Sequence, residues 1–386
     1  DHVRLYNLNR LAVVRQLQYS KKNSNEIDLA IFVNGLPVVT IELKNTLTGQ
    51  KHHEAIKQYI TSRPIDGEKL LEFKRCLVHF AVGTEEVYMT TRLAGEKTRF
   101  FPFNKCYQNK GVESRSGYRT SYLWEDVLRR DSLLDLLQNY IEVQVNEEKV
   151  YNEKTGKLET KTEEALIFPR YHQRRAVQKL VAHSKQNGAG HRYLIQHSAG
   201  SGKSNTISWL AFRLSSLYQK MYEGSDKAVF DSVIVVTDRR ALDKQLGDNI
   251  AQFAQTEGEV VLINDNKTSQ DLKKAIEGKK KIIVTTLQKF PVIADSIQLF
   301  PDRRYAVIID EAHSSQSGED ARQMRKALSL EEAERFDEAE EQEYDREEML
   351  NAHIEAEIKR KGMKGNVSFY AFTATPKDKT IELSCE

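Results

Sequence analysis

A chain of 386 residues is long enough for two or three domains with hydrophobic cores of ordinary size. Its 39% hydrophobic and 30% charged residues are typical of a globular protein and exclude an intrinsically disordered one. With 58 Lys+Arg against 56 Asp+Glu residues, the net charge is only +2. The chain is therefore not a polycation, and a nucleic-acid surface must come from local clustering of charge.

The cysteines and the apolar runs narrow the class of protein further. Cys76, Cys106 and Cys385 lie far apart, with no C-x-x-C spacing, which argues against a zinc site or a disulfide scaffold and indicates the reducing cytoplasm. The sequence contains no signal peptide, and no apolar run approaches the ~18 residues of a membrane span. The chain begins at Asp1 rather than Met, which indicates a part of a longer protein.

Short β-rich runs alternate with one helical stretch from about residue 25 to residue 82, an α/β pattern. Asp28, Glu42 and Lys44 form a D…E-x-K pattern across two of these runs, which join at Asn34-Gly35, a strong hairpin signal. Glu42 and Lys44 are two residues apart on the strand, so both point to the same face.

The register of this hairpin decides whether the two carboxylates meet. If the loop comprises residues 34–36 and Val33 pairs with Pro37, Asp28 lies directly opposite Glu42. A two-residue loop would shift the register by one and put the carboxylates on opposite faces. We therefore expect the three-residue loop, because two adjacent carboxylates can share a Mg²⁺ ion that activates water and stabilises charge on a phosphodiester.

This arrangement resembles the active site of PD-(D/E)xK nucleases. The resemblance implies that Lys44 positions the nucleophile or neutralises charge on the phosphate. Glu42 and Lys44 interrupt an otherwise apolar strand. Unpaired charges in such a strand are costly, which favours a functional role for these two residues. The helical run HHEAIKQYI follows, and its Gln58 resembles the Gln of the family's Q-x-x-x-Y motif. The expected Tyr position holds Ser62, and the neighbouring Tyr59 is not assigned to the motif.

The next segments suggest where the first domain ends. Residues 123–141 have the apolar spacing of a helix. The polar stretch at residues 146–164 predicts a linker or an exposed hairpin. We therefore expect a nuclease domain over residues 1–145 and a second domain over residues 165–386.

Strands predicted after residue 165 are near-continuous apolar runs that alternate with helical stretches, which indicates a parallel sheet covered on both faces. The runs are YLIQ (193–196), SVIVVT (232–237), EVVLI (259–263), KIIVTT (281–286), YAVIID (305–310) and SFYAFTAT (368–375). The strongly acidic residues 331–348 are expected to form a solvated helical insertion.

A candidate phosphate-binding loop follows the first of these strands and precedes an apolar helix, the context that a P-loop requires. Its residues are Ser198, Ala199, Gly200, Ser201, Gly202, Lys203 and Ser204. The glycines let backbone N–H groups turn toward phosphates, and the helix N-terminus adds its dipole. Lys203 would neutralise the β/γ oxygens and Ser204 would ligate Mg²⁺. His197 stands where the pattern places its first Gly.

Asp310-Glu311-Ala312-His313 closes the run YAVII, which puts two carboxylates at the C-terminal edge of a buried strand. Ligands of open α/β sheets bind at that edge. Asp310 can hold Mg²⁺ there, and Glu311 can orient and deprotonate the attacking water. Together with the P-loop, this motif predicts an NTPase.

At this point the chain resembles the DEAH-box branch of superfamily 2 helicases and translocases, over roughly residues 165–386. The matching motifs are PRYHQRRAV (169–177), VVTDRRALDKQ (235–245), VTTLQKF (284–290) and Thr373-Ala374-Thr375. The resemblance implies that Gln173 reads the adenine edge, and thus that the cofactor is ATP.

The same resemblance implies roles for residues at the other motifs. Contacts to the DNA phosphate backbone are implied for Thr237, Arg239 and Thr285. Coupling of hydrolysis to movement is implied for His313, Thr373 and Thr375. A second RecA-like domain with its arginine finger is missing after the last motif. We therefore expect this chain to bind ATP but to hydrolyse it poorly, which a single-turnover ATPase rate equal to that of a two-lobed relative would contradict.

The order of the motifs over the whole chain resembles the restriction (motor) subunit of type I restriction–modification enzymes. That subunit joins methyltransferase and specificity subunits, pulls double-stranded DNA with ATP and cuts it as an endonuclease. Two further marks of the family, TTRL (90–93) and FFPFN (100–104), are expected to be structural. His52 and His53 are expected to be ordinary helix-surface residues.

Two other functions compete with this interpretation. A free-standing helicase–nuclease of DNA repair or phage defence would have both sites but no methyltransferase partner. A nuclease-dead, ATP-dependent remodeller would use the D…E-x-K segment only as a hairpin surface. Dependence of cleavage on partner subunits separates the first two, and loss of cleavage on mutating Glu42 separates both from the third.

Overall fold

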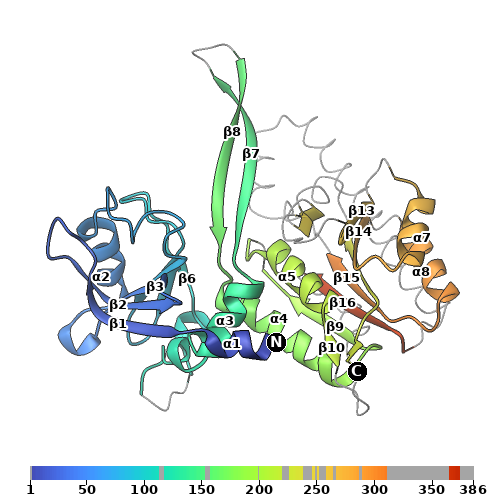
Figure 1. The fold of residues 1–386 in the computed structure, drawn as a ribbon, viewed down its shortest axis with the longest axis horizontal. Helices are drawn as coiled ribbons and strands as arrows, with labels where there is room; N and C mark the ends of the chain where they lie inside the picture. The colour runs from blue at the N-terminus through green and yellow to red at the C-terminus, as the bar shows by residue number, and fades with distance from the viewer. Residues whose placement is uncertain are drawn as a thin grey trace, which may run out of the picture. The chain divides into compact units, whose positions relative to one another are not determined.

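The computed structural model describes residues 2–112, 117–152, 157–198, 200–219, 226–237, 246–247, 250–251, 258–263, 267–286, 289–310 and 365–373. Backbone contacts divide the chain into two compact units, Asp1–Arg174 and Arg175–Glu386. Each unit contains a six-stranded sheet of its own (Figure 1). The acidic residues 331–348 lie outside the described residues.

The sheet of the first unit has its strands in sequence order. They are β1 (Leu11–Gln18), β2 (Glu26–Val33), β3 (Leu36–Leu43), β4 (Val78–Val82), β5 (Val87–Thr90) and β6 (Phe101–Pro102). β3 and β4 pair in parallel and every other neighbouring pair is antiparallel, so the sheet is mixed. Parallel pairing of β3 and β4 requires a crossover, and the helical segment between them provides it.

The hairpin of β2 and β3 differs from the three-residue loop that the sequence analysis favours. Asn34 and Gly35 alone form the turn, with φ of 53° and 83°, as a type I′ turn requires, and Val33 pairs with Leu36. The register then shifts at a β-bulge, so that Ile31 pairs with Val39. The extra residue of the bulge restores the register that the longer loop was expected to provide.

Short helical segments precede, connect or follow the strands of the first sheet. They are α1 (His2–Leu8), η1 (Thr46–Thr48), α2 (His52–Lys57), the π-helical η2 (Gln58–Ser62), η3 (Tyr107–Asn109), the π-helical η4 (Leu123–Val127) and α3 (Arg130–Asn139). The single helix expected over residues 123–141 is therefore two segments. Arg129 separates them because its backbone is extended, with φ −63° and ψ 152°.

A long antiparallel hairpin follows α3. Its strands are β7 (Glu142–Asn152) and β8 (Lys157–Ile167), which pair only with each other (Figure 1). The polar residues 146–152 and 157–164 lie within this hairpin, whose two-stranded form needs few apolar side chains because it has no sheet to cover.

The sheet of the second unit is parallel throughout, in the order β13-β14-β12-β15-β16-β9. Its strands are β9 (Arg192–Gln196), β12 (Ser232–Thr237), β13 (Val260–Ile263), β14 (Ile282–Thr286), β15 (Tyr305–Asp310) and β16 (Val367–Thr373). The predicted parallel sheet is confirmed, and its Val/Ile runs are buried because helices cover both faces. Two short strands, β10 (Tyr218–Gln219) and β11 (Lys227–Ala228), precede β12 in the chain and form a separate antiparallel pair.

Helices pack on both faces of this sheet. They are α4 (Tyr171–Asn187), α5 (Lys203–Ser215), α7 (Ser269–Glu277) and α8 (Phe290–Leu299). Side chains of α7 and α8 share a buried cluster with Phe369. The next residue of the strand, Tyr370, points to the opposite face, where its hydroxyl is 2.7 Å from the Ser184 hydroxyl of α4.

Thr268 and Asp271 form a capping box at the N-terminus of α7. Thr268 accepts a hydrogen bond from the Asp271 backbone N–H (3.3 Å), and Asp271 accepts one from the Thr268 N–H (2.8 Å). Because this capping box satisfies two N–H groups, we expect Thr268→Ala to destabilise α7 by about 1 kcal/mol. Faster hydrogen exchange of the α7 amides would show this effect, whereas Thr268→Ser should retain protection.

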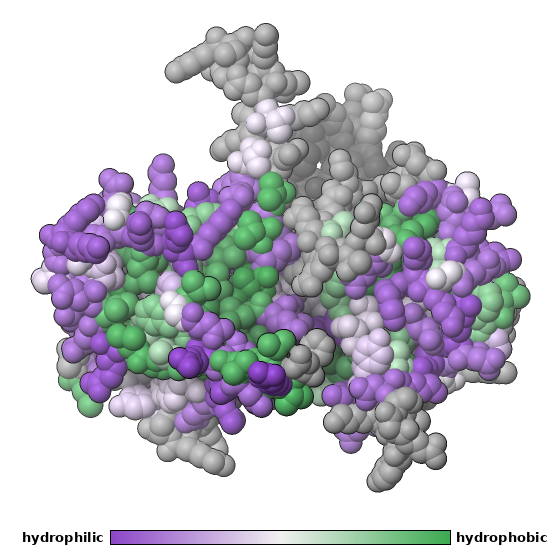
Figure 2. All heavy atoms as spheres, viewed as in Figure 1, coloured by the Kyte–Doolittle hydropathy of each residue, from purple (hydrophilic) through white to green (hydrophobic). Residues whose placement is uncertain are grey.

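Apolar side chains also reach the surface of the first unit. Figure 2 shows hydrophobic residues gathered over the region where β1 to β3 lie in Figure 1. Val13 is 63% exposed, and Leu43 and Trp124 are each about two-fifths exposed. Within the described ranges, no helix is both long and apolar enough to cross a membrane.

Candidate functional site

The first candidate site lies on β2 and β3, where Asp28 and Glu42 belong to adjacent strands. The register after the bulge pairs Leu29 with Ile41, so Asp28 lies opposite Glu42 one step further along. The Asp28 Oδ2 atom accepts a hydrogen bond from the Leu43 backbone N–H at 2.7 Å. The structure therefore brings the two predicted carboxylates together, although through a bulge rather than a longer loop.

Glu42 is a fully buried carboxylate with one strong partner. Its Oε1 atom accepts a hydrogen bond from Arg63 Nε at 2.9 Å, within an ion pair whose side chains are 0% and 9% exposed. Burial, followed by the charge of Asp28, raises the pKa of Glu42 to about 8, while Arg63 opposes that shift. Arg63 lies outside the D…E-x-K and Q-x-x-x-Y patterns and was not predicted. Two observations could have pointed to it. An acid in an apolar strand needs a positively charged partner, and Arg63 directly follows the helical run that contains Gln58.

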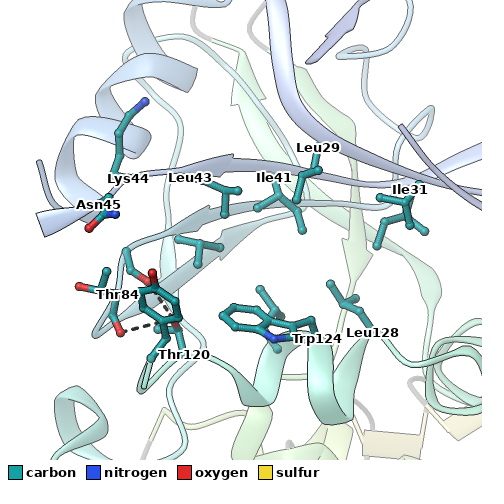
Figure 3. Close-up of a pocket in the computed structure, with 15 residues that line it drawn as sticks. Leu29, Ile31, Ile41, Leu43, Lys44, Asn45, Thr84, Thr120, Trp124 and Leu128 are labelled. Atoms are coloured by element: carbon teal, nitrogen blue, oxygen red, sulfur yellow. Dashed lines mark hydrogen bonds between the residues drawn. The ribbon is translucent and has the colours of Figure 1, made fainter. Parts of the chain in front are cut away.

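The other two predicted residues, Lys44 and Gln58, lie in the segments that follow β3. Lys44 follows the end of β3 on the same side as Glu42, and Figure 3 shows its side chain pointing away from the apolar pocket on the opposite face. Gln58 is half-buried at the start of η2 and donates no side-chain hydrogen bond to Asp28 or Glu42, all of which lie in the described part of the chain. Tyr59 is instead a core residue, with its hydroxyl 2.9 Å from the Thr40 hydroxyl.

The chemistry of the two carboxylates bears on whether they can hold Mg²⁺. Among the residues that the structure describes, no group of three or more His, Cys, Asp or Glu side chains could hold a metal ion. Mg²⁺ in proteins commonly uses only one or two carboxylates and fills its other positions with water. The Glu42 Oε2 atom is buried and has no hydrogen-bond partner within the described ranges. Asp28 and Glu42 therefore fit this cation.

His79 lies beside this site in the core of the sheet. It is 1% exposed, and its Nδ1 atom is 2.6 Å from the Thr40 hydroxyl. Burial lowers the pKa of His79 from 6.5 to about 3. The folded state therefore holds the imidazole neutral, whereas the unfolded chain binds a proton below pH 6.5.

This burial predicts an acid-sensitive contribution to stability. The contribution of His79 is complete above pH 6.5 and decreases as the pH falls toward 3, so at pH 5 it is smaller by about 2 kcal/mol. We expect the loss of unfolding free energy between pH 7 and pH 5 to be larger for the wild type than for His79→Gln by that amount. Hydrogen exchange of the β3 and β4 amides measures it, and equal pH dependence would contradict it.

An apolar pocket of about 640 Å³ occupies the opposite face of the sheet. Figure 3 shows Leu29, Ile31 and Ile41 facing Trp124 and Leu128 across it. Its described lining contains no carboxylate and no histidine. Lys44 stands at its rim, while Asp28 and Glu42 are not part of the lining, so the pocket borders the candidate nuclease site from the other face of the sheet.

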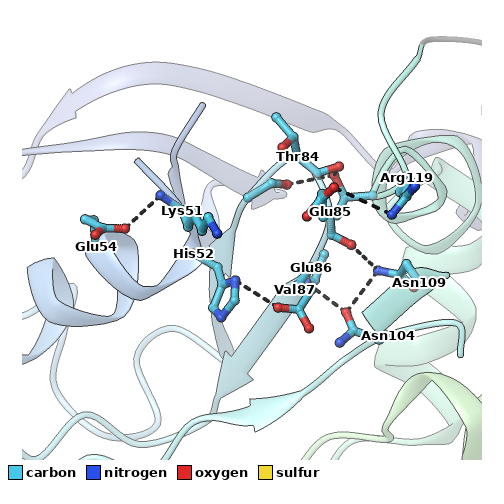
Figure 4. Close-up of polar contacts among 12 residues, drawn as sticks. Lys51, His52, Glu54, Thr84, Glu85, Glu86, Val87, Asn104, Asn109 and Arg119 are labelled. Carbon is cyan, nitrogen blue, oxygen red and sulfur yellow. Dashed lines mark hydrogen bonds and ion pairs between the residues drawn. The ribbon is translucent and has the colours of Figure 1, made fainter. Parts of the chain in front are cut away.

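Figure 4 shows a polar network around α2 and β5. The expectation that His52 is a helix-surface residue is wrong. His52 is 6% exposed, its Nδ1 atom is 3.2 Å from Glu86 Oε2, and its ring stacks on Tyr88. Burial lowers its pKa to about 4, because its face of α2 packs on the sheet. His53, one residue further, is exposed as expected.

The marks TTRL and FFPFN make contacts typical of structural residues. Leu93 and Phe103 belong to the buried core. The Asn104 side chain accepts a hydrogen bond from the Val87 N–H at 2.9 Å, and the Asn109 side chain donates one to the Glu85 carbonyl at 2.7 Å (Figure 4). These contacts hold the loop after β6 against β5.

The second candidate site lies at the carboxyl edge of the parallel sheet. The register places Thr237, Asp310 and Thr286 at the same level, and Thr373 beside Gln196 at the end of β9. The phosphate-binding loop follows β9, and α5 begins at Lys203. Because parallel strands end together, the loop and Asp310 meet at one edge.

The loop has the backbone that its glycines permit. Gly200 and Gly202 have φ of 70° and 82°, which side chains with a Cβ rarely adopt. Lys203 Nζ lies 2.8 Å from Asp310 Oδ1 in an ion pair that is largely buried on the Asp310 side. Ser198 is exposed, Ser201 is buried and Ser204 is half-buried at the start of α5.

His197, which replaces the first Gly of the pattern, is buried beneath the loop. Its Nδ1 atom is 3.0 Å from the Ser201 hydroxyl, and its backbone N–H donates a hydrogen bond to the Thr373 carbonyl at 2.8 Å. The residue thereby connects the loop to the end of β16. Gln173 caps α4, because its Oε1 atom accepts a hydrogen bond from the Arg170 N–H at 2.8 Å.

Other residues assigned from the sequence are buried or not described. Thr237 and Thr285 are 1% and 2% exposed, so neither side chain is accessible to a DNA phosphate in this structure, and their DNA role stays a prediction. Thr373 is fully buried. Five predicted residues lie outside the described residues: Ala199, Arg239, Glu311, His313 and Thr375.

Two family models match the chain. Residues 172–382 match the SWI2/SNF2 ATPase family, which is more than half of the 386 residues. Residues 3–98 match the N terminus of the type I restriction enzyme R protein. The two matches fall on the segments that carry the two candidate sites.

Curated relatives agree with these models. A Methanocaldococcus jannaschii protein provisionally named as a type I restriction enzyme endonuclease subunit is 27% identical over 330 residues, covering 80% of this chain and 29% of that protein. A type I restriction enzyme endonuclease subunit of Haemophilus influenzae is 26% identical over 322 residues, covering 80% of this chain and 28% of its own. The chain thus spans less than a third of the length of these relatives.

Solved structures resemble parts of the chain at low identity. A nuclease-deletion mutant of the Type ISP restriction-modification enzyme LlaGI in complex with a DNA substrate mimic matches 53% of this chain and 17% of its own, with 17% identity and a TM-score of 0.31. The Pyrococcus furiosus Hef helicase domain matches 55% of this chain and 35% of its own, with 16% identity and a TM-score of 0.32.

The family models carry the assignment, since one of them covers most of the second unit and the other covers the strands that hold Asp28 and Glu42. The predicted likeness to a restriction subunit is thereby confirmed. The chain belongs to the SWI2/SNF2 ATPase family and joins that ATPase to the N-terminal region of a type I restriction enzyme R protein.

Proposed function

We propose that this chain carries the endonuclease and the first motor lobe of a type I restriction subunit, which moves double-stranded DNA with ATP and cleaves it with Mg²⁺. The observation that supports this most is the presence of two separate charged sites in one chain, the pair Asp28–Glu42 and the pair Lys203–Asp310. We assign the nuclease to residues 1–145 and the motor to residues 165–386.

In the motor, Lys203 and Asp310 form an ion pair with Nζ 2.8 Å from Oδ1. The phosphates of ATP carry more negative charge than one carboxylate, so Lys203 would exchange Asp310 for the β/γ oxygens. Asp310 and the Ser204 hydroxyl would then hold Mg²⁺, which neutralises charge on those oxygens. We assign Glu311 to the attacking water and Gln173 to the adenine. This change of partner by Lys203, from Asp310 to the phosphates, would couple nucleotide binding to Asp310 at the carboxyl edge of the sheet.

In the nuclease, Asp28 and Glu42 would hold Mg²⁺, which supplies an activated water and stabilises charge on the phosphodiester. Lys44 lies on the same side of β3 as Glu42, where its ammonium group would neutralise the phosphate. The buried position of Glu42 excludes bulk water from one side of the pair. Cleavage therefore depends on this chain's two carboxylates and one lysine.

The test uses the full-length protein together with its methyltransferase and specificity subunits. We expect cleavage of unmodified circular DNA that requires ATP, Mg²⁺ and both partners. Cleavage without partners would instead indicate the free-standing helicase–nuclease. ATP hydrolysis and DNA movement without any cleavage would indicate the remodeller.

A further inference from the structure

Arg63 has a position that the D…E-x-K pattern does not account for. It directly follows η2, where its backbone leaves the helical conformation at φ −118° and ψ 80°, and Pro64 comes next. This turn brings the guanidinium group under the sheet, with Nε 2.9 Å from Glu42 Oε1. The Arg63 side chain is only 9% exposed, which is unusual for a charged residue, and it forms an ion pair with Glu42.

The contacts divide the carboxylate oxygens into two kinds. The Leu43 N–H occupies Asp28 Oδ2, and Arg63 occupies Glu42 Oε1. Glu42 Oε2 is buried, with no hydrogen-bond partner in the part of the chain that the structure describes. In each acid a protein N–H group therefore fixes one carboxylate oxygen. The second oxygen of Glu42, Oε2, is available to a cation.

We propose that Arg63 is a positioning residue of the nuclease site: its Nε–H holds Glu42 Oε1 so that Oε2 faces the divalent cation shared with Asp28. This inference rests on the proposed nuclease function. Arginine suits the task because its guanidinium is always charged and its N–H groups lie in a fixed plane, whereas a lysine ammonium fixes no plane. A bond partner behind a metal-binding side chain orients that side chain and tunes its affinity.

Two electrostatic effects of Arg63 oppose each other. Its positive charge repels a cation at Oε2, but the same charge attracts Oε1 at 2.9 Å and holds the Glu42 carboxylate in one orientation. The Nε–Oε1 contact is charge-assisted and buried, and the delocalised guanidinium charge lies behind the carboxylate, so we expect the orienting effect to dominate. Removing Arg63 should therefore weaken cation binding, not strengthen it.

The experiment measures Mn²⁺ binding to the full-length protein by calorimetry, without DNA and without nucleotide. The binding event that disappears in Glu42→Ala identifies the nuclease site. If Glu42→Ala removes no binding event, the proposed nuclease function fails, which is distinct from a failure of Arg63. Given such an event, we expect Arg63→Ala to weaken it by about 10- to 100-fold. DNA cleavage by this variant should return at high Mn²⁺, which a purely structural defect would not allow.

The matched control is Arg75→Ala, because Arg75 is an exposed arginine of the same unit, 3.7 Å from Glu72. Its Mn²⁺ affinity should equal that of the wild type. Arg63→Ala binding as tightly as the wild type, or more tightly, would overturn the proposal. If Arg63→Ala does not fold, Arg63→Lys decides: weaker binding by about tenfold supports the positioning role, and unchanged binding overturns it.

Discussion

Replacing Glu42 with glutamine should abolish DNA cleavage by the full-length protein and leave its ATPase activity unchanged. The amide oxygen can still accept the Arg63 Nε–H bond, so the buried contact survives. The amide nitrogen, however, is a donor at the position of Oε2 and cannot ligate a cation. We expect the cleavage rate to fall by at least about 10²-fold, measured on circular DNA in the presence of ATP and Mg²⁺.

The matched control for this variant is Glu72→Gln, which neutralises a more exposed acid of the same unit. It should cleave DNA at the wild-type rate. Cleavage that persists in Glu42→Gln would mean that the nuclease site lies elsewhere in the protein. Loss of ATPase activity in the same variant would mean that the substitution acts through the fold.

Replacing Lys203 with alanine should have the second large effect, on the motor. The substitution removes the ammonium group that pairs with Asp310 at 2.8 Å and that we assign to the β/γ oxygens of ATP. Because an uncompensated phosphate charge is costly at the edge of the sheet, we expect DNA-stimulated ATP hydrolysis to fall by at least about 10²-fold. A coupled phosphate-release assay on the full-length protein measures this.

Lys273→Ala is the control, because Lys273 is an exposed lysine on α7 of the same unit. It should leave ATP hydrolysis unchanged. Mn²⁺ binding at the nuclease site should survive in Lys203→Ala, since the residues of that site belong to the first unit. Unchanged translocation by Lys203→Ala would contradict the assignment of the phosphate loop.

The parallel sheet was predictable because its signals are local. Six apolar runs, each followed by a helical or loop segment, give strands within a residue or two of the predicted bounds. The phosphate loop was predictable for the same reason, since glycines at fixed spacing between a strand and a helix need no distant partner. The meeting of Lys203 with Asp310 follows from one rule, that parallel strands end at a common edge.

The first unit was predicted less completely, because its features depend on contacts between remote residues. The pairing of Asp28 with Glu42 was expected, but the bulge that achieves it was not, since a bulge depends on the packing of both strands. His52 carries no sequence mark that distinguishes it from exposed His53, and only the packing of α2 on the sheet buries one and exposes the other.

The sequence by itself determined the α/β class, the order of the two units, the phosphate loop and Asp310 at its sheet edge, because periodicity and motif spacing are properties of neighbouring residues. Only the tertiary structure decided the environment of the nuclease acids. Arg63 reaches Glu42 from the crossover between β3 and β4, and the burial of that pair depends on the packing of this crossover against the sheet. Burial and partnership are set by three-dimensional contacts, which no local pattern encodes.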